Sequence, residues 1–400
     1  MAQVWDVAIS GGGATGLSLA LLLRVLSGGA LSVVLIDQSD PALRSGPRTS
    51  ALAEGPRRMF DRLGVWKKLF EKAQPILKME ISDANLADAV KTALLSFKAG
   101  GGSEPLAHML FHRDLEPQLF AAATDQGVHI VTDALEDIAY SPTSATLRTR
   151  AGISIRTRLL VGADGLRSKT RTAARIPVIS WPYNRTALVF TIAHEYEHDG
   201  LAIQHFLEGG PFAVLPVTGR RSSIVWTEPS AKASELLKMS QAALSAEIDA
   251  RIGGRFGEIQ IEEGPQSFPL VLQLARRFIG RRLALIGDAA HRVHPLAGQG
   301  LNIGLRDVAT LAELVIERAK LGLDPGAEDL LGEYERRRRF DATTSAAAFD
   351  FMHGAYSLSS SPARLAKRIG MGILDRTDGL KSALLGEASG TTGAIPSLFR

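Results

Sequence analysis

The chain contains no cysteine among its 400 residues. This absence excludes a disulfide framework, a catalytic thiolate and a cysteine-ligated metal site. Aromatic residues make up only 6% of the chain and the formal net charge is only +4, so we expect no nucleic-acid partner. Apolar runs are broken well short of the about 18 residues that a membrane-spanning helix requires. Too little sequence precedes the first predicted strand for a signal peptide, and we therefore expect a cytoplasmic location.

The first half of the chain alternates strand-like and helix-like segments, which predicts an α/β fold. Short strand-like segments between residues 186 and 228 are separated by turns and predict an antiparallel sheet. Histidines and carboxylates show no tight metal-ligand spacing, so no metal is predicted. A hairpin is expected over 145–157, and helices are expected over 50–73, 116–126, 231–252, 304–320 and 328–352.

A glycine-rich turn follows the first predicted strand. The motif G-x-G-x-x-G permits a tight turn at Gly11, the approach of a pyrophosphate at Gly13 and close packing of the next helix at Gly16. Asp37 ends the second predicted strand 21 residues after Gly16, where a carboxylate can bind ribose hydroxyls. The segment predicts a site for an adenosine diphosphate group. Its predicted binding residues are Gly11, Gly13, Ala14, Thr15, Gly16 and Asp37.

Two further motifs follow buried strands, at Gly162-Ala163-Asp164-Gly165 and at Gly287-Asp288. Together with the glycine turn they resemble the group A flavoprotein aromatic hydroxylases. Within that group, the run from His291 to Asn302 is similar to the ubiquinone-biosynthesis hydroxylases. The resemblance implies a Rossmann-like FAD-binding domain of the para-hydroxybenzoate hydroxylase type, with an inserted antiparallel-sheet substrate domain and C-terminal helices. The FAD-binding domain is expected over 1–75, 105–175 and 275–325, the substrate domain over 76–104 and 176–274, and the helical region over 326–400.

The resemblance also assigns residues to FAD. Arginine guanidinium groups reach the flavin or its phosphates, the Asp288 carboxylate accepts from a ribityl hydroxyl, and Pro295 lies against the flavin. The helix that follows Gly300 directs its N-terminus at the pyrimidine edge, where its dipole favours negative charge. Read without the family, Asp288 is an N-cap and the arginines are surface residues. The residues implied beyond the glycine turn are Arg48, Arg113, Asp164, Asp288, Pro295, Gly298, Gly300, Leu301 and Asn302.

The implied reaction uses NADH or NADPH and O2, and hydroxylates an electron-rich ring through a C4a-hydroperoxide of the flavin. The cofactor carries this chemistry, so no catalytic acid–base residue is predicted. Substrate would lie against the second sheet, where period-two alternation puts Gln204 with Phe206 on one face and Phe212 with Val214 on one face. The sequence does not decide which face meets the flavin.

The family's substrate is a polyprenyl phenol, which implies an enzyme on the inner face of the membrane or in a biosynthetic complex. Residues 364–374 mix basic and apolar side chains, which fits peripheral membrane contact or a helix packed on its own domain. Three alternatives remain open at this point. They are a flavin hydroxylase of a soluble aromatic, a flavin-dependent prenyl reductase, and a non-catalytic protein of the same fold.

Overall fold

The computed structural model describes residues 3–40, 43, 45–83, 93–99, 104–292, 300–339 and 395–400. Its first sheet has eight strands, with a main path in the order β17-β18-β11-β1-β2-β8. β1 pairs in parallel with both β11 and β2, so the strand that leads into the glycine turn is central. The strands are β1 (Val4–Ser10), β2 (Val33–Asp37), β8 (His129–Thr132), β9 (Leu135–Tyr140), β10 (Ala145–Thr149), β11 (Ser154–Gly162), β17 (Ile279–Gly280) and β18 (Leu283–Leu285).

Apolar helices cover this sheet. The helix α1 (Ala14–Leu26) is almost entirely buried because it packs against the sheet, α8 (Gly300–Lys320) and α4 (His112–Asp125). One continuous apolar core joins these helices to β1, β2, β11 and β18. The helix expected over 304–320 is confirmed, and it begins four residues earlier than expected. The expected hairpin is also confirmed, as antiparallel pairing of β10 with β11.

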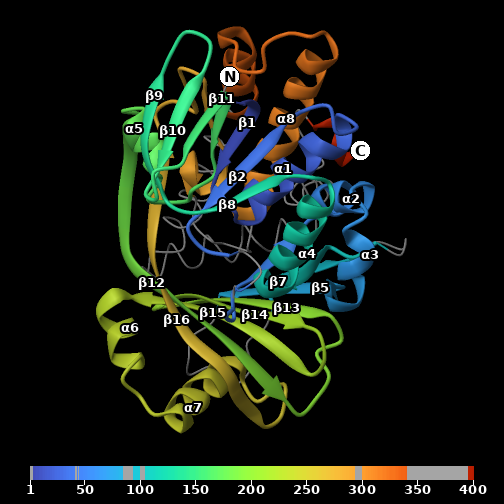
Figure 1. Ribbon diagram of the computed structural model, residues 1–400. Coiled ribbons are helices and arrows are strands. Elements are labelled where there is room, and N and C mark those ends of the chain that lie inside the picture. The colour runs from blue at the N-terminus through green and yellow to red at the C-terminus, as the bar shows by residue number, and fades with distance from the viewer. Residues whose placement is uncertain are drawn as a thin grey trace.

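The second sheet also has eight strands, in the order β19-β16-β12-β15-β14-β13-β5-β6. Its longest strands, β12 and β16, each span 17 residues and run from the first sheet down to the second along one side of the molecule (Figure 1). The strands are β5 (Lys78–Asp83), β6 (Leu95–Lys98), β12 (Val178–His194), β13 (Leu201–Leu207), β14 (Gly210–Val217), β15 (Arg221–Pro229), β16 (Ile259–Ala275) and β19 (His291–Arg292).

The two faces of the second sheet have different neighbours. The face farther from the first sheet packs on α6 (Ser230–Leu236) and α7 (Gln241–Ile252), and Figure 1 shows these helices below it. Phe212 and Val214 belong to this core and are fully buried. Their neighbours Ala213 and Leu215 point to the opposite face, toward the first sheet, because side chains alternate along a strand.

A three-stranded sheet lies between the two larger ones and is formed by β3 (Thr49–Leu52), β7 (Ala107–Phe111) and β4 (Gln74–Ile76). The expectation of a helix over 50–73 is therefore wrong at its start and end. Only α2 (Glu54–Arg62), α3 (Trp66–Leu69) and the short turn η2 (Phe70–Lys72) are helical there. Thr49–Leu52 forms a strand because it pairs with β7, more than fifty residues away.

The end of the chain returns to the half of the molecule that contains the first sheet. Residues 328–339 are helical, and η5 (Ser397–Phe399) packs against α2. The remainder of the predicted helix over 328–352, and residues 364–374, lie outside the described residues. Within the described part of the chain, no helix combines the length and apolarity that crossing a membrane requires.

Candidate active site

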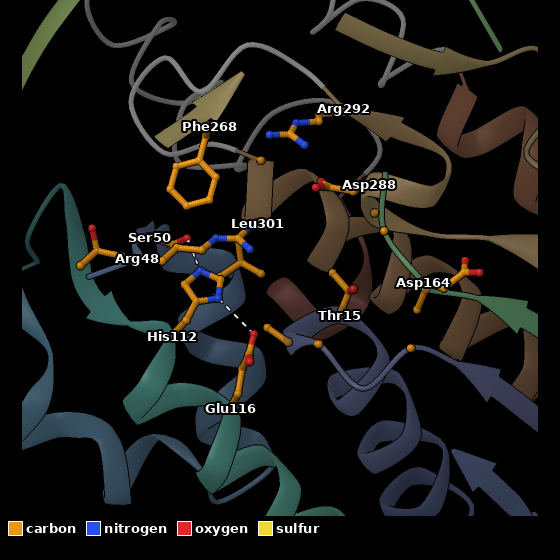
Figure 2. A pocket seen from close by; sticks show the side chains of 18 of the residues that line it. Thr15, Arg48, Ser50, His112, Glu116, Asp164, Phe268, Asp288, Arg292 and Leu301 are labelled. Carbon is orange, nitrogen blue, oxygen red and sulfur yellow. Dashed lines mark hydrogen bonds and ion pairs between the residues drawn. The ribbon is translucent and has the colours of Figure 1, made fainter. Parts of the chain in front are cut away.

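A cavity of about 1000 Å³ lies between the two large sheets. Its walls come from the glycine turn and the motifs after β11 and β18 on one side, and from β12–β16 on the other. A volume of this size is at the upper end of the range for small-molecule and cofactor sites. Figure 2 shows side chains from the N-terminal, middle and C-terminal parts of the chain facing this space. The sequence motifs therefore converge on one site.

The glycine turn approaches neighbouring backbone more closely than any side chain permits. Gly11 has φ +111°, and a Cβ there would lie 2.3 Å from the carbonyl oxygen of Ala163. A Cβ on Gly16 would lie 1.9 Å from the carbonyl oxygen of Gly11. The turn therefore needs glycine at both positions. Gly11, Gly13, Ala14 and Thr15 line the cavity.

Asp37 lies at the end of β2, beside this turn. Its Oδ2 accepts a hydrogen bond from the backbone N–H of Gly12 over 2.5 Å, and its Oδ1 accepts from the N–H of Ser39 over 2.8 Å. Asp37 lines the cavity, so its carboxylate is held next to the predicted dinucleotide site. This geometry fits the ribose contact that the sequence predicts.

Asp164 follows β11 and lines the cavity, but its carboxylate is engaged by its own loop. It accepts hydrogen bonds from the hydroxyl and the N–H of Thr170, over 2.7 and 3.0 Å. Arg171 then ties this loop to the Gly287 segment, because it donates to the carbonyls of Leu166 and Ala289 over 2.7 and 2.8 Å. The motif thus shapes the cavity wall through its backbone.

Asp288 lies in the short turn η3 (Gly287–Ala289) and borders the cavity together with Thr15 and Arg292 (Figure 2). The turn is held from below by Asp307 of α8. Asp307 Oδ2 accepts from the N–H of Gly287 over 2.9 Å and lies 2.6 Å from His291 Nε2. A fully buried carboxylate therefore fixes the backbone that carries Asp288.

The two predicted arginines have different environments. Arg48 lines the cavity, whereas Arg113 lies outside its described lining. The Arg113 guanidinium pairs with Glu263 of β16, at 2.5 Å, and lies over the Phe111 ring at 4.0 Å. Contact of Arg113 with the cofactor stays a prediction, and in this structure the ion pair directs its guanidinium to the second sheet. The pair joins α4 to β16.

The start of α8 contributes Gly300 and Leu301 to the cavity. Asn302 lies outside the described lining of the cavity, and its contact with the flavin ring stays a prediction. Its amide donates to the carbonyl of Ala51 over 2.8 Å and accepts from the N–H of Ala53 over 3.0 Å. Asn302 therefore positions the end of β3 beside the helix N-terminus. The remaining predicted residues of this segment, Pro295 and Gly298, lie outside the described residues.

The second sheet supplies an apolar wall. Its lining side chains include Ala187, Val189, Ala213, Leu215, Val225 and Leu270. Gln204 is the predicted substrate residue that lines this wall; it is 6% exposed, and its Nε2 has no hydrogen-bond partner among the described residues. Phe212 and Val214 face α6 and α7, so their prediction as substrate residues is corrected. Phe206 is buried and outside the described lining of the cavity.

The structure also brings three unpredicted polar residues to the cavity. Ser50, His112 and Glu116 are buried there in one hydrogen-bonded chain, which is drawn with dashed lines in Figure 2. Ser50 and His112 are 62 positions apart in the sequence, so no local pattern could have indicated their contact. The i, i+4 spacing of His112 and Glu116 would have indicated a pair only if the predicted helix over 116–126 had been extended back to His112, where α4 begins. Among the described residues, no group of three or more histidines and carboxylates is arranged to hold a metal ion.

Comparisons with known proteins agree with this site. A sequence model described as an FAD binding domain matches residues 4–347. The fold is similar to that of p-nitrophenol 4-monooxygenase PnpA from Pseudomonas putida, with a TM-score of 0.79 at 18% identity, over 98% of this chain and all of that chain. The family model and the fold therefore define an FAD-binding protein that has the fold of the group A monooxygenases.

Closer relatives narrow the class to one family. The chain is 40% identical to ubiquinone hydroxylase UbiL of Rhodospirillum rubrum, over 97% of this chain and 90% of the relative. It is 30% identical to 3-demethoxyubiquinol 3-hydroxylase of Escherichia coli, over 97% of this chain and 99% of the relative. The chain belongs to the family of FAD-dependent ubiquinone-biosynthesis hydroxylases.

Proposed function

We propose that this protein hydroxylates the aromatic ring of a polyprenyl-phenol precursor of ubiquinone, using FAD, NADH or NADPH, and O2. One observation carries the proposal. A single cavity joins the dinucleotide turn to an apolar wall on which one buried amide donor, Gln204 Nε2, has no partner among the described residues. An unpaired buried donor is costly, so a ligand oxygen at this position would stabilise it.

The residues present fit FAD. The glycine turn offers bare backbone and the N–H groups of α1 to a pyrophosphate, because a Cβ at Gly11 or Gly16 would collide with backbone. Asp37 and the N-terminus of α8 line the same cavity. That helix end favours negative charge on a bound ring. FAD, once reduced by NAD(P)H, supplies the activated oxygen for the hydroxylation.

The role of the protein is to bind the substrate, to orient it and to exclude water from it. The small apolar side chains on β12, β14 and β15 would cover one face of the phenol ring and exclude water. Gln204 would donate a hydrogen bond to a ring oxygen and so fix which ring carbon meets the flavin. No proton transfer by Gln204 is needed.

Purified protein tests the proposal directly. We expect it to be yellow, and we expect a prenylated phenol to stimulate NAD(P)H oxidation and to gain one oxygen atom by mass spectrometry. Complementation of bacterial strains that each lack one ring-hydroxylation step would identify the ring carbon. Turnover of soluble phenols alone would favour a hydroxylase of soluble aromatics, and reduction of a prenyl chain would favour the reductase. Protein that cannot be loaded with FAD would contradict enzymatic function.

We further propose that the protein acts at the membrane surface, alone or in a biosynthetic complex. The lipid character of the proposed substrate and the mixture of basic and apolar residues in 364–374 support this. Flotation of the full chain with anionic liposomes, compared with a chain truncated before residue 364, measures the contribution of this segment. Equal flotation of the two would exclude a role for it.

A further inference from the structure

Three buried side chains form a continuous hydrogen-bonded chain on the cavity wall. Ser50 Oγ lies 2.9 Å from His112 Nε2, and His112 Nδ1 lies 3.1 Å from Glu116 Oε1. Ser50 and His112 are each 8% exposed, Glu116 is 4% exposed, and all three line the cavity. In Figure 2 the chain runs from Ser50 through the imidazole to the carboxylate. A buried histidine between a hydroxyl and a carboxylate is equipped to gain and lose a proton.

The chemistry of the three groups assigns the direction of each hydrogen bond. An ionised Glu116 only accepts, so His112 carries its proton on Nδ1 and donates it to the carboxylate. His112 Nε2 then accepts from the Ser50 hydroxyl, whose oxygen keeps lone pairs for a donor in the cavity. When Nε2 becomes protonated the bond reverses. Ser50 then accepts from His112 and turns its own hydrogen toward the cavity.

Strand alternation places this chain on the cofactor side. Thr49 lies on the other face of β3, because its hydroxyl is 2.9 Å from that of Ser223 in the second sheet. Ser50 and Leu52 therefore face the first sheet, and Leu52 lies in the core of that sheet. Asn302 binds the backbone on either side of Leu52 and so fixes β3 beside the N-terminus of α8.

The charged groups around His112 have opposing effects on the stability of its protonated imidazolium form. His112 is the first residue of α4, where the helix dipole disfavours an imidazolium, and Arg48, which directly precedes β3, lines the same cavity. Glu116 favours the imidazolium. From the other elements, four acids and three cations line the cavity: Asp37, Asp133, Asp164, Asp288, Arg167, Lys169 and Arg292. Arg113 is paired with Glu263, and the first turn of α8 carries no acid.

We infer that His112 is a redox-linked proton acceptor for the FAD bound beside it. Hydride transfer oxidises NAD(P)H and reduces FAD, which adds negative charge to the cavity. His112 Nε2 takes up one proton from solvent to offset that charge, and it returns this proton to solvent when the FAD is reoxidised. Ser50 changes from acceptor to donor in the same step. The inference rests on FAD binding and reduction, and it does not depend on which aromatic is hydroxylated.

The midpoint potential of the FAD-loaded full chain, measured without substrate between about pH 5 and pH 9, tests this inference. For a two-electron couple, each additional proton taken up on reduction makes the potential fall by about 30 mV more per pH unit. We expect a pH range with this additional slope in the wild-type protein and its loss in His112→Gln. Glu116→Gln should move the range to lower pH, because the carboxylate no longer stabilises the imidazolium.

His205→Gln is the matched control. His205 is equally buried and lies 2.6 Å from the Ser82 hydroxyl, but this second serine–histidine pair is outside the described lining of the cavity. The His205→Gln substitution should leave the pH slope of the midpoint potential unchanged.

Proton uptake by the wild-type protein during photoreduction, followed with an indicator dye, gives a readout that needs no variant. Uptake equal to that of free FAD at every pH would overturn the inference, as would equal slopes in wild type and His112→Gln. Absence of hydroxylation leaves both measurements valid, so this inference and the proposed function fail separately.

Discussion

Arg338 and Asp307 form an ion pair that is wholly enclosed in the FAD-binding half. The Nε–Oδ1 distance is 2.7 Å, and the two side chains are 1% and 0% exposed. Burial alone raises the pKa of Asp307, but the charges of His291 and Arg338 and their hydrogen bonds outweigh burial and hold this pKa below its ordinary value. Since Asp307 also holds Gly287, the pair connects the helix over 328–339 to the turn that carries Asp288.

Asp307→Asn should therefore destabilise the protein and weaken FAD binding together. Removing one partner of a buried ion pair costs about 3–5 kcal/mol, because the other charge is left buried. Chemical denaturation would measure the loss, and flavin fluorescence titration would measure the affinity. Asp329→Asn is the control, since the pair of Asp329 with Arg318 is at the surface. It should change neither quantity appreciably, and equal effects of the two variants would contradict this account.

The buried side chain of His108 makes the folding stability of the protein depend on pH. Burial lowers the pKa of His108 from 6.5 to about 4, and the charge of Arg57, which also lowers this pKa, is opposed by the charge of Glu54, which raises it. The unfolded chain therefore binds the proton more readily, and neutral His108 stabilises the fold above pH 6.5. This contribution, about 3 kcal/mol, is lost progressively as the pH falls from 6.5 toward 4. His108→Gln should flatten the stability curve in this range, whereas a substitution at exposed His129 should leave its slope as in wild type.

Gly11→Ala should strongly weaken FAD binding. The new Cβ would lie 2.3 Å from the Ala163 carbonyl oxygen at φ +111°, so the turn must change shape. We expect at least a tenfold loss of flavin affinity by fluorescence titration. Gly28→Ala matches it in having a positive φ, +59°, but has no atom within 4 Å of the added Cβ. Its flavin affinity should stay at the wild-type value; a comparable loss would remove the steric argument.

Gln204→Leu should weaken substrate binding without affecting the flavin. The loss of one hydrogen bond costs about 1 kcal/mol, or roughly a fivefold increase in KM. Thr191→Val is the matched control, because Thr191 Oγ1 is also buried without a partner among the described residues but lies outside the described cavity lining. An unchanged KM in Gln204→Leu, with flavin affinity intact, would exclude the proposed contact.

The sequence predicted the parts of this site that depend on local patterns. Gly11, Asp37 and Asp288 each stand at the end of a predicted strand, and the carboxyl ends of parallel strands meet at one edge of a sheet. Their convergence on the cavity follows from the α/β alternation alone. The ion pair of Arg113 with Glu263 joins residues 150 positions apart, and no local sequence pattern could have indicated it.

Long-range pairing also explains the missed residues. Apolar side chains at near-helical spacing predicted a helix over 50–73, but pairing with β7 makes a strand of Thr49–Leu52 and turns Ser50 toward His112. The period-two alternation of side chains distinguished the face of β13 that bears Gln204 from the opposite face. It could not show that α6 and α7 would cover the face of the sheet that bears Phe212. The partner of each face is a tertiary property.

The alternation of side chains along β14 determines how substitutions on this strand would affect the protein. Ala213 and Leu215 border the cavity, whereas Phe212 and Val214 fill the core beneath it. Substrate range and folding stability are thus encoded at alternate positions of one strand. Substitutions at the odd-numbered positions can reshape the space for a different ring substituent while the even-numbered positions keep the sheet folded.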